Sequence, residues 1–113
     1  MAEVGFYRYI SAGELQSIRS DRVIRSMSGV TYFSPDRYDD PGEAQGKLAL
    51  PQQPDYRLGP LPADERPDFA ASPLQPVGYI DSQRPGGGVE GATIKPIYLF
   101  AIFDYASGTS SLS

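Results

Sequence analysis

The sequence predicts a small mixed α+β domain built from short strands and two short helices. The chain has 113 residues, the usual size of one domain with one modest core. Its 12 glycines and 11 prolines favour turns and disfavour long helices. Segments rich in aromatic and β-branched residues alternate with two segments that carry helix-start signals. We therefore expect a single domain over residues 1–113.

The first strand and helix are predicted by local composition. Residues 4–10 (VGFYRYI) are aromatic and β-branched, which is typical of a strand. Ser11 and Glu14 form the capping-box pattern, so we expect a helix over 12–20. Residues 23–24 are expected to form a short extended piece.

A second strand and a second helix follow. The segment 29–33 (GVTYF) predicts a short strand. Asp40 followed by Pro41 matches an N-cap with proline at the first helical position, so we expect a helix over 41–50. Its inward-facing residues are expected to be Ala44, Leu48 and Ala49.

Prolines dominate the next part of the chain. Seven of them lie between positions 51 and 76, and Pro85 follows. The apolar residues among them indicate an ordered connector with short edge strands, for example over 56–58. A disordered linker is the alternative interpretation.

The C-terminal part of the chain predicts two more strands. Residues 89–93 follow a sharp glycine turn and are expected to form a short strand. The continuous apolar character of 97–103 predicts a strand in a buried central position. The small polar residues of 106–113 predict a frayed tail.

The composition limits the chemistry that the chain can perform. The sequence contains no Cys and no His, which excludes disulfides, Cys/His zinc sites and Ser–His or Cys–His pairs. General acid–base chemistry would therefore depend on Asp, Glu, Tyr or Lys. The net charge of −4 does not favour nonspecific binding to nucleic acid or to acidic membranes. The longest apolar run is too short to span a bilayer, so no membrane partner is expected.

Arg8 and an aromatic pair are the first candidate site residues. On a strand, Phe6, Arg8 and Ile10 share one face, so Arg8 is expected to point into a cleft or to a buried partner. A position on a surface strand edge or in a structural ion pair is the alternative. Tyr32 and Phe33 are either core aromatics or a stacking surface for a flat ring.

Glu90 is the third candidate. It follows Gly86, Gly87 and Gly88, whose conformational freedom permits close backbone approach to a ligand. A carboxylate at the start of a strand beside such a turn can be aimed at a reacting carbon. The alternative is a flexible hairpin followed by a solvated Glu.

In their order along the chain, these features resemble the ADP-ribosyltransferase superfamily over about residues 5–103. Residues 7–11 (YRYIS) are similar to a first strand that carries Tyr-His before Thr or Ser, with Arg8 at the His position. Residues 29–34 (GVTYFS) resemble the segment that carries a nicotinamide-facing Tyr. Residues 85–90 (PGGGVE) resemble a segment of toxin domains related to the tuberculosis necrotizing toxin, which are NAD glycohydrolases. The last residue of that segment is commonly Gln, whereas here it is Glu.

The resemblance implies a fold and a set of site residues. The fold would have two packed short β-sheets that form a central NAD cleft, with two short helices. Glu90, Arg8 and Tyr32 would be catalytic, a mixed set because the first-strand His and the Ser-Thr-Ser motif of the known branches are missing. The NAD contacts would come from Arg8, Tyr32, Phe33, Gly87 and Gly88, and no metal would be needed. Arg8 would hold the pyrophosphate or the adenosine ribose.

The resemblance also implies a function. The chain would be an NAD-dependent mono-ADP-ribosyltransferase toxin that uses NAD as co-substrate and modifies a macromolecule, expected to be a protein. Glu at position 90 favours transfer, because a carboxylate can activate an incoming nucleophile. An NAD glycohydrolase is the alternative, and a noncatalytic protein-binding module is the second alternative.

The biological setting is implied in the same way. The chain would be the C-terminal domain of a larger polymorphic bacterial toxin, secreted or delivered in competition between bacteria. It would act in the target-cell cytoplasm and have a cognate immunity protein as partner.

Overall fold

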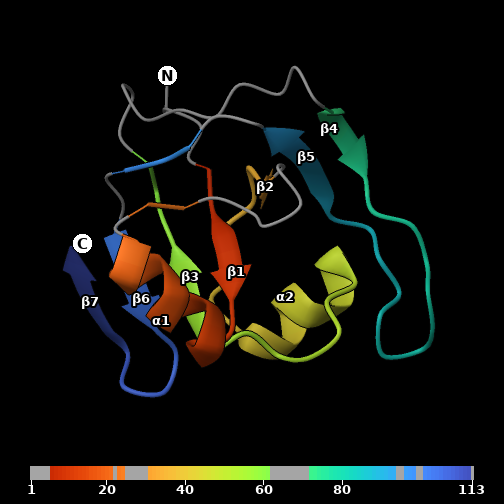
Figure 1. Ribbon diagram of the computed structural model, residues 1–113. Helices are drawn as coiled ribbons and strands as arrows, with labels where there is room; N and C mark the ends of the chain where they lie inside the picture. The colour runs from red at the N-terminus through yellow and green to blue at the C-terminus, as the bar shows by residue number, and fades with distance from the viewer. Residues whose placement is uncertain are drawn as a thin grey trace, which may run out of the picture.

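The computed structural model describes residues 6–21, 23–24, 31–61, 72–93, 96–98 and 101–112. These residues form a mixed α+β structure with two helices and two antiparallel sheets, which confirms the predicted fold class (Figure 1). The helices are α1 (Ala12–Asp21) and α2 (Pro41–Leu48). The first sheet has the strand order β1 (Arg8–Ile10), β3 (Tyr56–Leu58), β6 (Ala101–Asp104) and β7 (Thr109–Leu112). The second has the order β2 (Thr31–Phe33), β5 (Val89–Thr93) and β4 (Ser72–Pro76).

Both helices begin at the capping residues that the sequence predicts. At the start of α1, the Ser11 hydroxyl oxygen accepts a hydrogen bond from the Glu14 N–H at 3.2 Å. At the start of α2, the Asp40 carboxylate accepts one from the Glu43 N–H at 3.0 Å, and Pro41 is the first helical residue. These bonds satisfy N–H groups that have no partner within the helix.

Helix α2 ends two residues earlier than the sequence predicts. Ala49 adopts a left-handed conformation with φ of 53° and caps the helix through a hydrogen bond from its N–H to the Gln45 carbonyl. Ala44 and Leu48 are buried, as expected. Ala49 was expected to face inward as a helical residue, which is wrong, because it is the C-cap.

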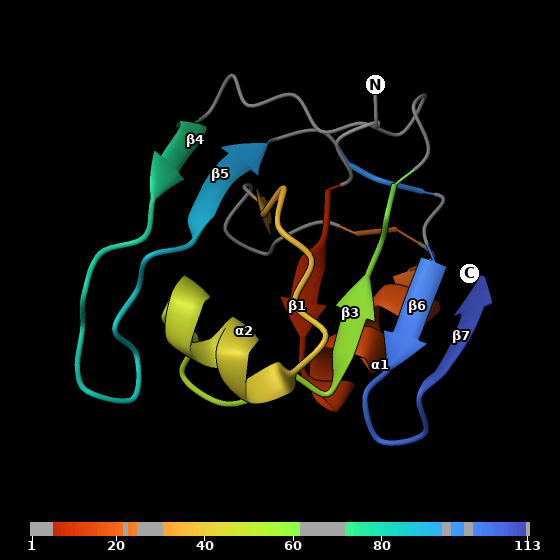
Figure 2. The same ribbon diagram turned by 180° about the vertical axis from the view of Figure 1, so that it is seen from behind.

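Strand β1 separates two clusters of buried apolar side chains. Successive residues of a strand point to opposite faces, so Phe6 and Ile10 lie on one face and Tyr7 and Tyr9 on the other. The first face meets α1, and the second meets α2 (Figures 1 and 2). The larger cluster contains Phe6, Ile10, Leu15, Ile18, Ile24, Phe33, Leu58, Leu61, Ile97 and Ile102.

The proline-rich connector differs in part from the prediction. The extended piece at 56–58 is present as β3, but it pairs with β1 on one side and β6 on the other. The expectation of an edge strand at this position is therefore wrong. Strand β4 does lie at a sheet edge, where its two prolines are tolerated. Residues 62–71 of the connector lie outside the described residues.

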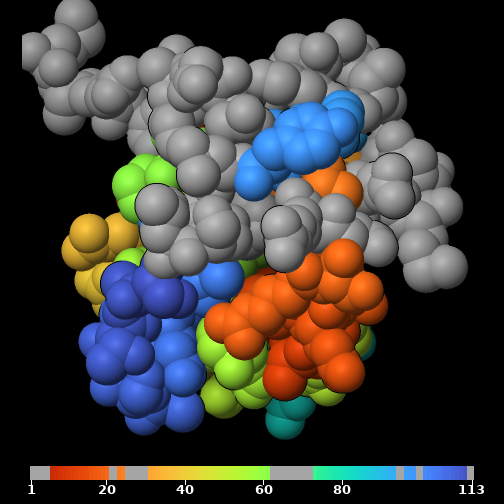
Figure 3. Space-filling view, turned by 60° about the vertical axis from the view of Figure 1, so that its left-hand side comes forward, coloured from red at the N-terminus to blue at the C-terminus, as the bar shows by residue number. Residues whose placement is uncertain are grey.

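The predicted strand over 97–103 is divided. Ile97 forms an isolated bridge with Ile24, which confirms the expected extended piece at 23–24. Pro96 and Tyr98 are exposed, Tyr98 to 62% (light blue in Figure 3), whereas Ile97 between them is fully buried. Strand β6 covers Ala101–Asp104 and takes the expected inner position between β3 and β7, and residues 99–100 lie outside the described residues.

The C-terminal segment is more ordered than its composition suggests. Residues 109–112 form β7, which pairs with β6 in an antiparallel hairpin (blue in Figure 3). The expectation of a frayed tail is therefore wrong for these residues. Two other predictions are only partly covered, because residues 4–5 and 29–30 lie outside the described residues.

Candidate functional site

A cavity of about 350 Å³ lies between β1, the first turn of α1, β2, β5 and the segment that follows α2. This volume is in the usual range for small-molecule sites. The lining includes Arg8, Tyr32 and Glu90, the residues predicted to be catalytic. Leu48 and Leu50 form an apolar part of the cavity wall. Arg8 and Glu90 are 82 positions apart in the sequence, and the fold brings them to one cavity.

Pairing between β2 and β5 places Tyr32 and Glu90 on the same face. The strands are antiparallel, and Tyr32 lies opposite Ala92. Glu90 is two residues along β5 from Ala92, so its side chain points the same way. Tyr32 is 48% exposed, in contrast to its neighbour Phe33, which is 1% exposed within the larger core cluster. Tyr32 therefore offers an accessible ring, whereas Phe33 has a structural position.

Strand β1 is attached to the end of β2, which brings Arg8 to the cavity. Tyr7 and Ser34 exchange two backbone hydrogen bonds, each 2.8 Å long. The next residue, Arg8, donates from Nη1 to the Tyr32 carbonyl oxygen at 3.1 Å. Its Nε and Nη2 both lie 2.8 Å from Oε2 of Glu14. Arg8 therefore borders a cavity, as expected, and it also forms the ion pair that was the alternative, with a partner that is not buried.

The Glu90 carboxyl is half-buried beside Arg8. Burial raises its pKa above the ordinary glutamate value, and the positive charge of Arg8 opposes that rise. Desolvation disfavours the charged form of a carboxyl group, and a nearby cation favours it. A carboxylate with a raised pKa is a better proton acceptor than an ordinary one, which suits it to general-base chemistry.

The glycine turn contacts α2. The N–H of Gly88 donates to the Lys47 carbonyl at 3.0 Å. A Cβ at Gly88 would lie 2.7 Å from the Tyr38 hydroxyl and 2.9 Å from the Lys47 carbonyl oxygen, so only glycine fits. Gly87 faces the Lys47 side chain. Neither Gly87 nor Gly88 lines the cavity among the residues described, so the glycines have a packing role that the sequence interpretation did not include.

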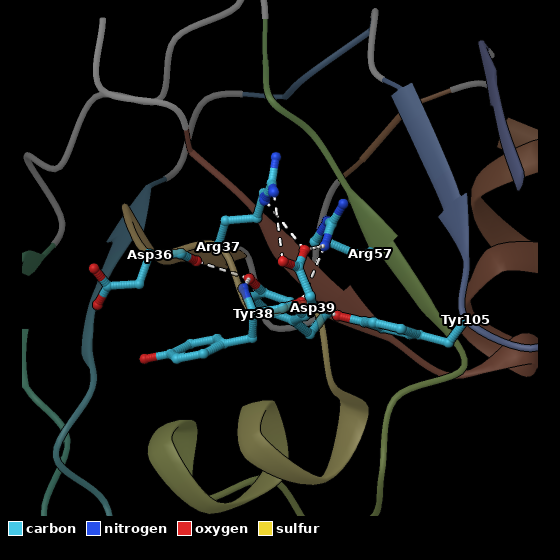
Figure 4. A network of polar contacts seen from close by, with 7 residues as sticks. Asp36, Arg37, Tyr38, Asp39, Arg57 and Tyr105 are labelled. Atoms are coloured by element: carbon cyan, nitrogen blue, oxygen red, sulfur yellow. Dashed lines mark hydrogen bonds and ion pairs between the residues drawn. The ribbon is translucent and has the colours of Figure 1, made fainter. Parts of the chain in front are cut away.

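Sequence reasoning missed Arg57, which lies at the centre of a second polar network (Figure 4). Its side chain is 9% exposed, and Nη1 donates to the Tyr38 carbonyl at 3.0 Å and to Asp39 Oδ1 at 3.1 Å. The guanidinium also lies 4.5 Å from the centre of the Phe103 ring. One signal could have identified it: Arg57 sits between apolar neighbours in a short strand, as Arg8 does.

Glu14 was also missed as a member of the cavity. The capping pattern alone accounts for a Glu at this position, so it does not indicate a second role. Its backbone N–H indeed meets Ser11, but its carboxylate reaches the lining and binds Arg8. An acidic residue at the start of a helix that follows an Arg-bearing strand is the signal that could have indicated this pair.

Two further properties concern the described part of the chain as a whole. No group of three or more acidic side chains there could hold a metal ion. No helix in the same ranges is both long and apolar enough to cross a membrane.

Comparisons with protein-family models, curated proteins and solved structures found no significant match to this chain. The function proposed next is therefore based on the cavity and on the motifs that line it.

Proposed function

We propose that this chain is an NAD-dependent mono-ADP-ribosyltransferase toxin domain that breaks the nicotinamide–ribose bond and transfers ADP-ribose to a protein. One observation carries the proposal: Arg8, Tyr32 and Glu90 line a single cavity of about 350 Å³. These are the residues that the motif resemblance singles out, and they come from three separate strands. The motifs and the cavity are independent sources of support for the same three side chains.

Glu90 would stabilise the charge that develops on the ribose. Cleavage of NAD resembles glycoside hydrolysis, because nicotinamide leaves and the ribose becomes oxocarbenium-like. A fixed carboxylate close to that carbon stabilises the transition state, and partial burial strengthens the interaction by lowering the local dielectric. The half-buried position of Glu90 is suited to this role. The carboxylate would also bind the ribose 2′-hydroxyl.

Tyr32 would stack on the nicotinamide ring. Its side chain is about half exposed and borders the same cavity as Glu90. An aromatic face presented in this way holds a planar ring by offset stacking. Fixing the ring relative to Glu90 would keep the reacting bond in a productive geometry.

The acceptor of ADP-ribose distinguishes transfer from hydrolysis. A carboxylate with a raised pKa at position 90 supports activation of an incoming nucleophile. We therefore favour a protein acceptor over water. As a toxin domain the chain would belong to a larger bacterial protein, act in the cytoplasm of a target cell and have a cognate immunity protein.

The test is release of nicotinamide from NAD. The domain is incubated with tagged NAD in buffer and in cell lysate, and free nicotinamide and labelled macromolecules are measured. We expect release in lysate together with labelled protein. Rapid release in buffer alone would identify an NAD glycohydrolase instead. No release under either condition would contradict both the transferase and the glycohydrolase activity and would favour a noncatalytic protein-binding module.

A further inference from the structure

We propose that the cavity binds the cationic nicotinamide–ribose end of NAD and that Glu14 holds Arg8 there as a positioning residue, so that Arg8 does not bind the diphosphate. The choice of ligand rests on the proposed function. The sequence motifs assigned the pyrophosphate or the adenosine ribose to Arg8, and they assigned no role in the cavity to Glu14.

The contacts of Arg8 carry the first step of the argument. An arginine binds phosphate most strongly through two parallel N–H groups of its guanidinium. In Arg8 the Nε and Nη2 edge is engaged by Glu14 Oε2, with both distances at 2.8 Å. A third contact runs from Nη1 to the Tyr32 carbonyl. A diphosphate could use that edge only by displacing a bound carboxylate.

Glu14 is itself fixed by the fold. It lies in the first turn of α1, where its N–H donates to the Ser11 hydroxyl oxygen. Its side chain is more exposed than that of Arg8, 38% against 18%, so Glu14 forms the outer member of the pair. The helix start therefore fixes the backbone from which the Glu14 side chain reaches Arg8, and the carboxylate binds the guanidinium on the wall that Arg8 shares with Glu90.

The charge of the lining carries the second step. Among the residues that the structure describes, the charged members of the lining are Arg8, Glu14 and Glu90, one cation and two anions, with a formal net charge of −1. Such a cavity repels a diphosphate and attracts a cation. The nicotinamide ring of NAD is cationic while it is bonded to ribose, and the accessible face of Tyr32 also favours a cationic ring.

The same charge fits the cleavage step. When the bond between ribose C1′ and the ring nitrogen breaks, its electron pair goes to the nitrogen, and nicotinamide leaves as a neutral molecule. The positive charge moves to the ribose carbon, which a nucleophile then attacks. Because the cation stays within the cavity during this step, an anionic lining favours both the bound substrate and the transition state.

The binding test uses small ligands of different charge. N1-methylnicotinamide is a cation, nicotinamide is its neutral analogue, and inorganic diphosphate is the anionic probe. NMR titration of the whole domain should show the cation binding at least about threefold more tightly than nicotinamide, as one charge in a partly screened site predicts. Diphosphate should not compete with the cation.

Two variants test the role of Glu14. Glu14→Gln should abolish the preference for the cation and allow diphosphate to bind, because Arg8 loses its partner. Glu14→Asp retains the negative charge, so it should largely keep the preference for the cation that Glu14→Gln loses. A purely structural role of Glu14 does not predict this difference between the two variants. If Glu14→Gln does not fold, Glu90→Gln still tests the charge of the lining, since it brings the formal charge of the described lining residues to zero and should remove the preference, and Glu14→Asp then tests the role of Glu14.

The outcomes separate this inference from the proposed function, because ligand binding needs no turnover. Equal binding of the cation and nicotinamide by the wild type would overturn the inference, as would competition by diphosphate. Release of nicotinamide from NAD without a cation preference would overturn the inference alone. A cation preference that disappears in Glu14→Gln, in a domain that does not cleave NAD, would support the inference and contradict the proposed function.

Discussion

The hydroxyl of Tyr9 accepts a hydrogen bond from the Tyr38 backbone N–H at 2.8 Å and donates one to the Asp36 carbonyl at 2.7 Å. Burial raises the pKa of Tyr9, so the hydroxyl retains the proton that it donates. One side chain of β1 thus satisfies two backbone groups of the loop between β2 and α2. Since Tyr9 also lines the cavity next to Arg8, this loop is coupled to the site.

Tyr9→Phe is expected to destabilise the fold. The variant keeps the ring but leaves the two backbone groups without their partner, which costs about 1–3 kcal/mol of unfolding free energy. Tyr32→Phe is the matched control, because Tyr32 is 48% exposed, and a change of about 0.5 kcal/mol or less is expected. Urea unfolding measures both. Equal stability of the two variants would show that the Tyr9 hydroxyl does not hold the loop.

Arg57→Ala is expected to reduce the free energy of unfolding more than Tyr9→Phe does. The guanidinium packs over Phe103 and donates to the Tyr38 carbonyl, which also accepts from the Tyr105 hydroxyl at 2.7 Å (Figure 4). Truncation removes buried contacts and one of these two donors, so we expect a loss of about 2–4 kcal/mol in urea unfolding. A loss well below 1 kcal/mol would contradict a structural role for this network.

Asp39→Asn is the companion variant, and its effect should depend on pH. The hydrogen bond from Arg57 lowers the pKa of Asp39. A lowered pKa in the folded state stabilises the protein above the ordinary carboxyl pKa, and this contribution is lost as the pH falls through the lowered value. The wild type should therefore be more stable than Asp39→Asn near neutral pH, and the difference should shrink in acid. A constant difference across the acid range would contradict the assignment.

Local chemistry explains the elements that the sequence predicts well. The start of α2 follows from Asp40 and Pro41, because a cap acts within one turn of helix. Strand β5 matches the predicted 89–93 because the preceding glycines mark its start. The positions of β3 and β7 could not be predicted in this way, because each depends on pairing with β6, a segment distant from β3 in the sequence. The small polar residues of β7 carry no pattern of their own.

The site was predictable only in part. The motifs singled out Arg8, Tyr32 and Glu90, and the structure brings them to one cavity. The role of Glu14 depends on how α1 is oriented against β1, which no local pattern encodes. For Gly86, Gly87 and Gly88, the sequence predicts the backbone freedom but not the contacts. Their contact with α2 depends on tertiary packing.

Gly86→Ala should reveal how tightly the glycine turn is packed. Gly86 has φ of 77°, and a Cβ there would lie 2.5 Å from the carbonyl oxygens of both Val77 and Gly78. Backbone strain and overpacking together should reduce the free energy of unfolding by about 2–4 kcal/mol. Gly78→Ala is the control, because nothing lies within 4 Å of its Cβ position, and its effect should be about 0.5 kcal/mol or less. Thermal unfolding that ranks the two variants equally would contradict the packing assigned to the turn.

Glu90→Ala should reduce cleavage of NAD far more than it reduces stability. Removal of a preorganised electrostatic group costs about 2–3 kcal/mol of transition-state stabilisation or more. That loss corresponds to about a 30- to 150-fold fall in kcat/KM for nicotinamide release. Gln75→Ala is a close control, since Gln75 pairs with Glu90 across β4 and β5 and is exposed. It should keep near wild-type turnover, and wild-type turnover in Glu90→Ala would show that the active site lies elsewhere.

Glu90→Gln should stabilise the fold at neutral pH and have little effect in acid. Burial raises the pKa of the folded-state carboxyl, although Arg8 opposes the rise, so the folded protein holds this proton to a higher pH than the unfolded chain does. The stability associated with the protonated carboxyl is present below the unfolded pKa, about 4.3, and is lost as the pH rises through the folded value. The amide carries no charge and does not suffer this loss. Unfolding free energies of the two proteins should therefore converge below about pH 4 and separate at pH 7, with Glu90→Gln the more stable. A variant that is less stable than the wild type at pH 7 would show that attraction between Glu90 and Arg8 outweighs the cost of burying the carboxylate.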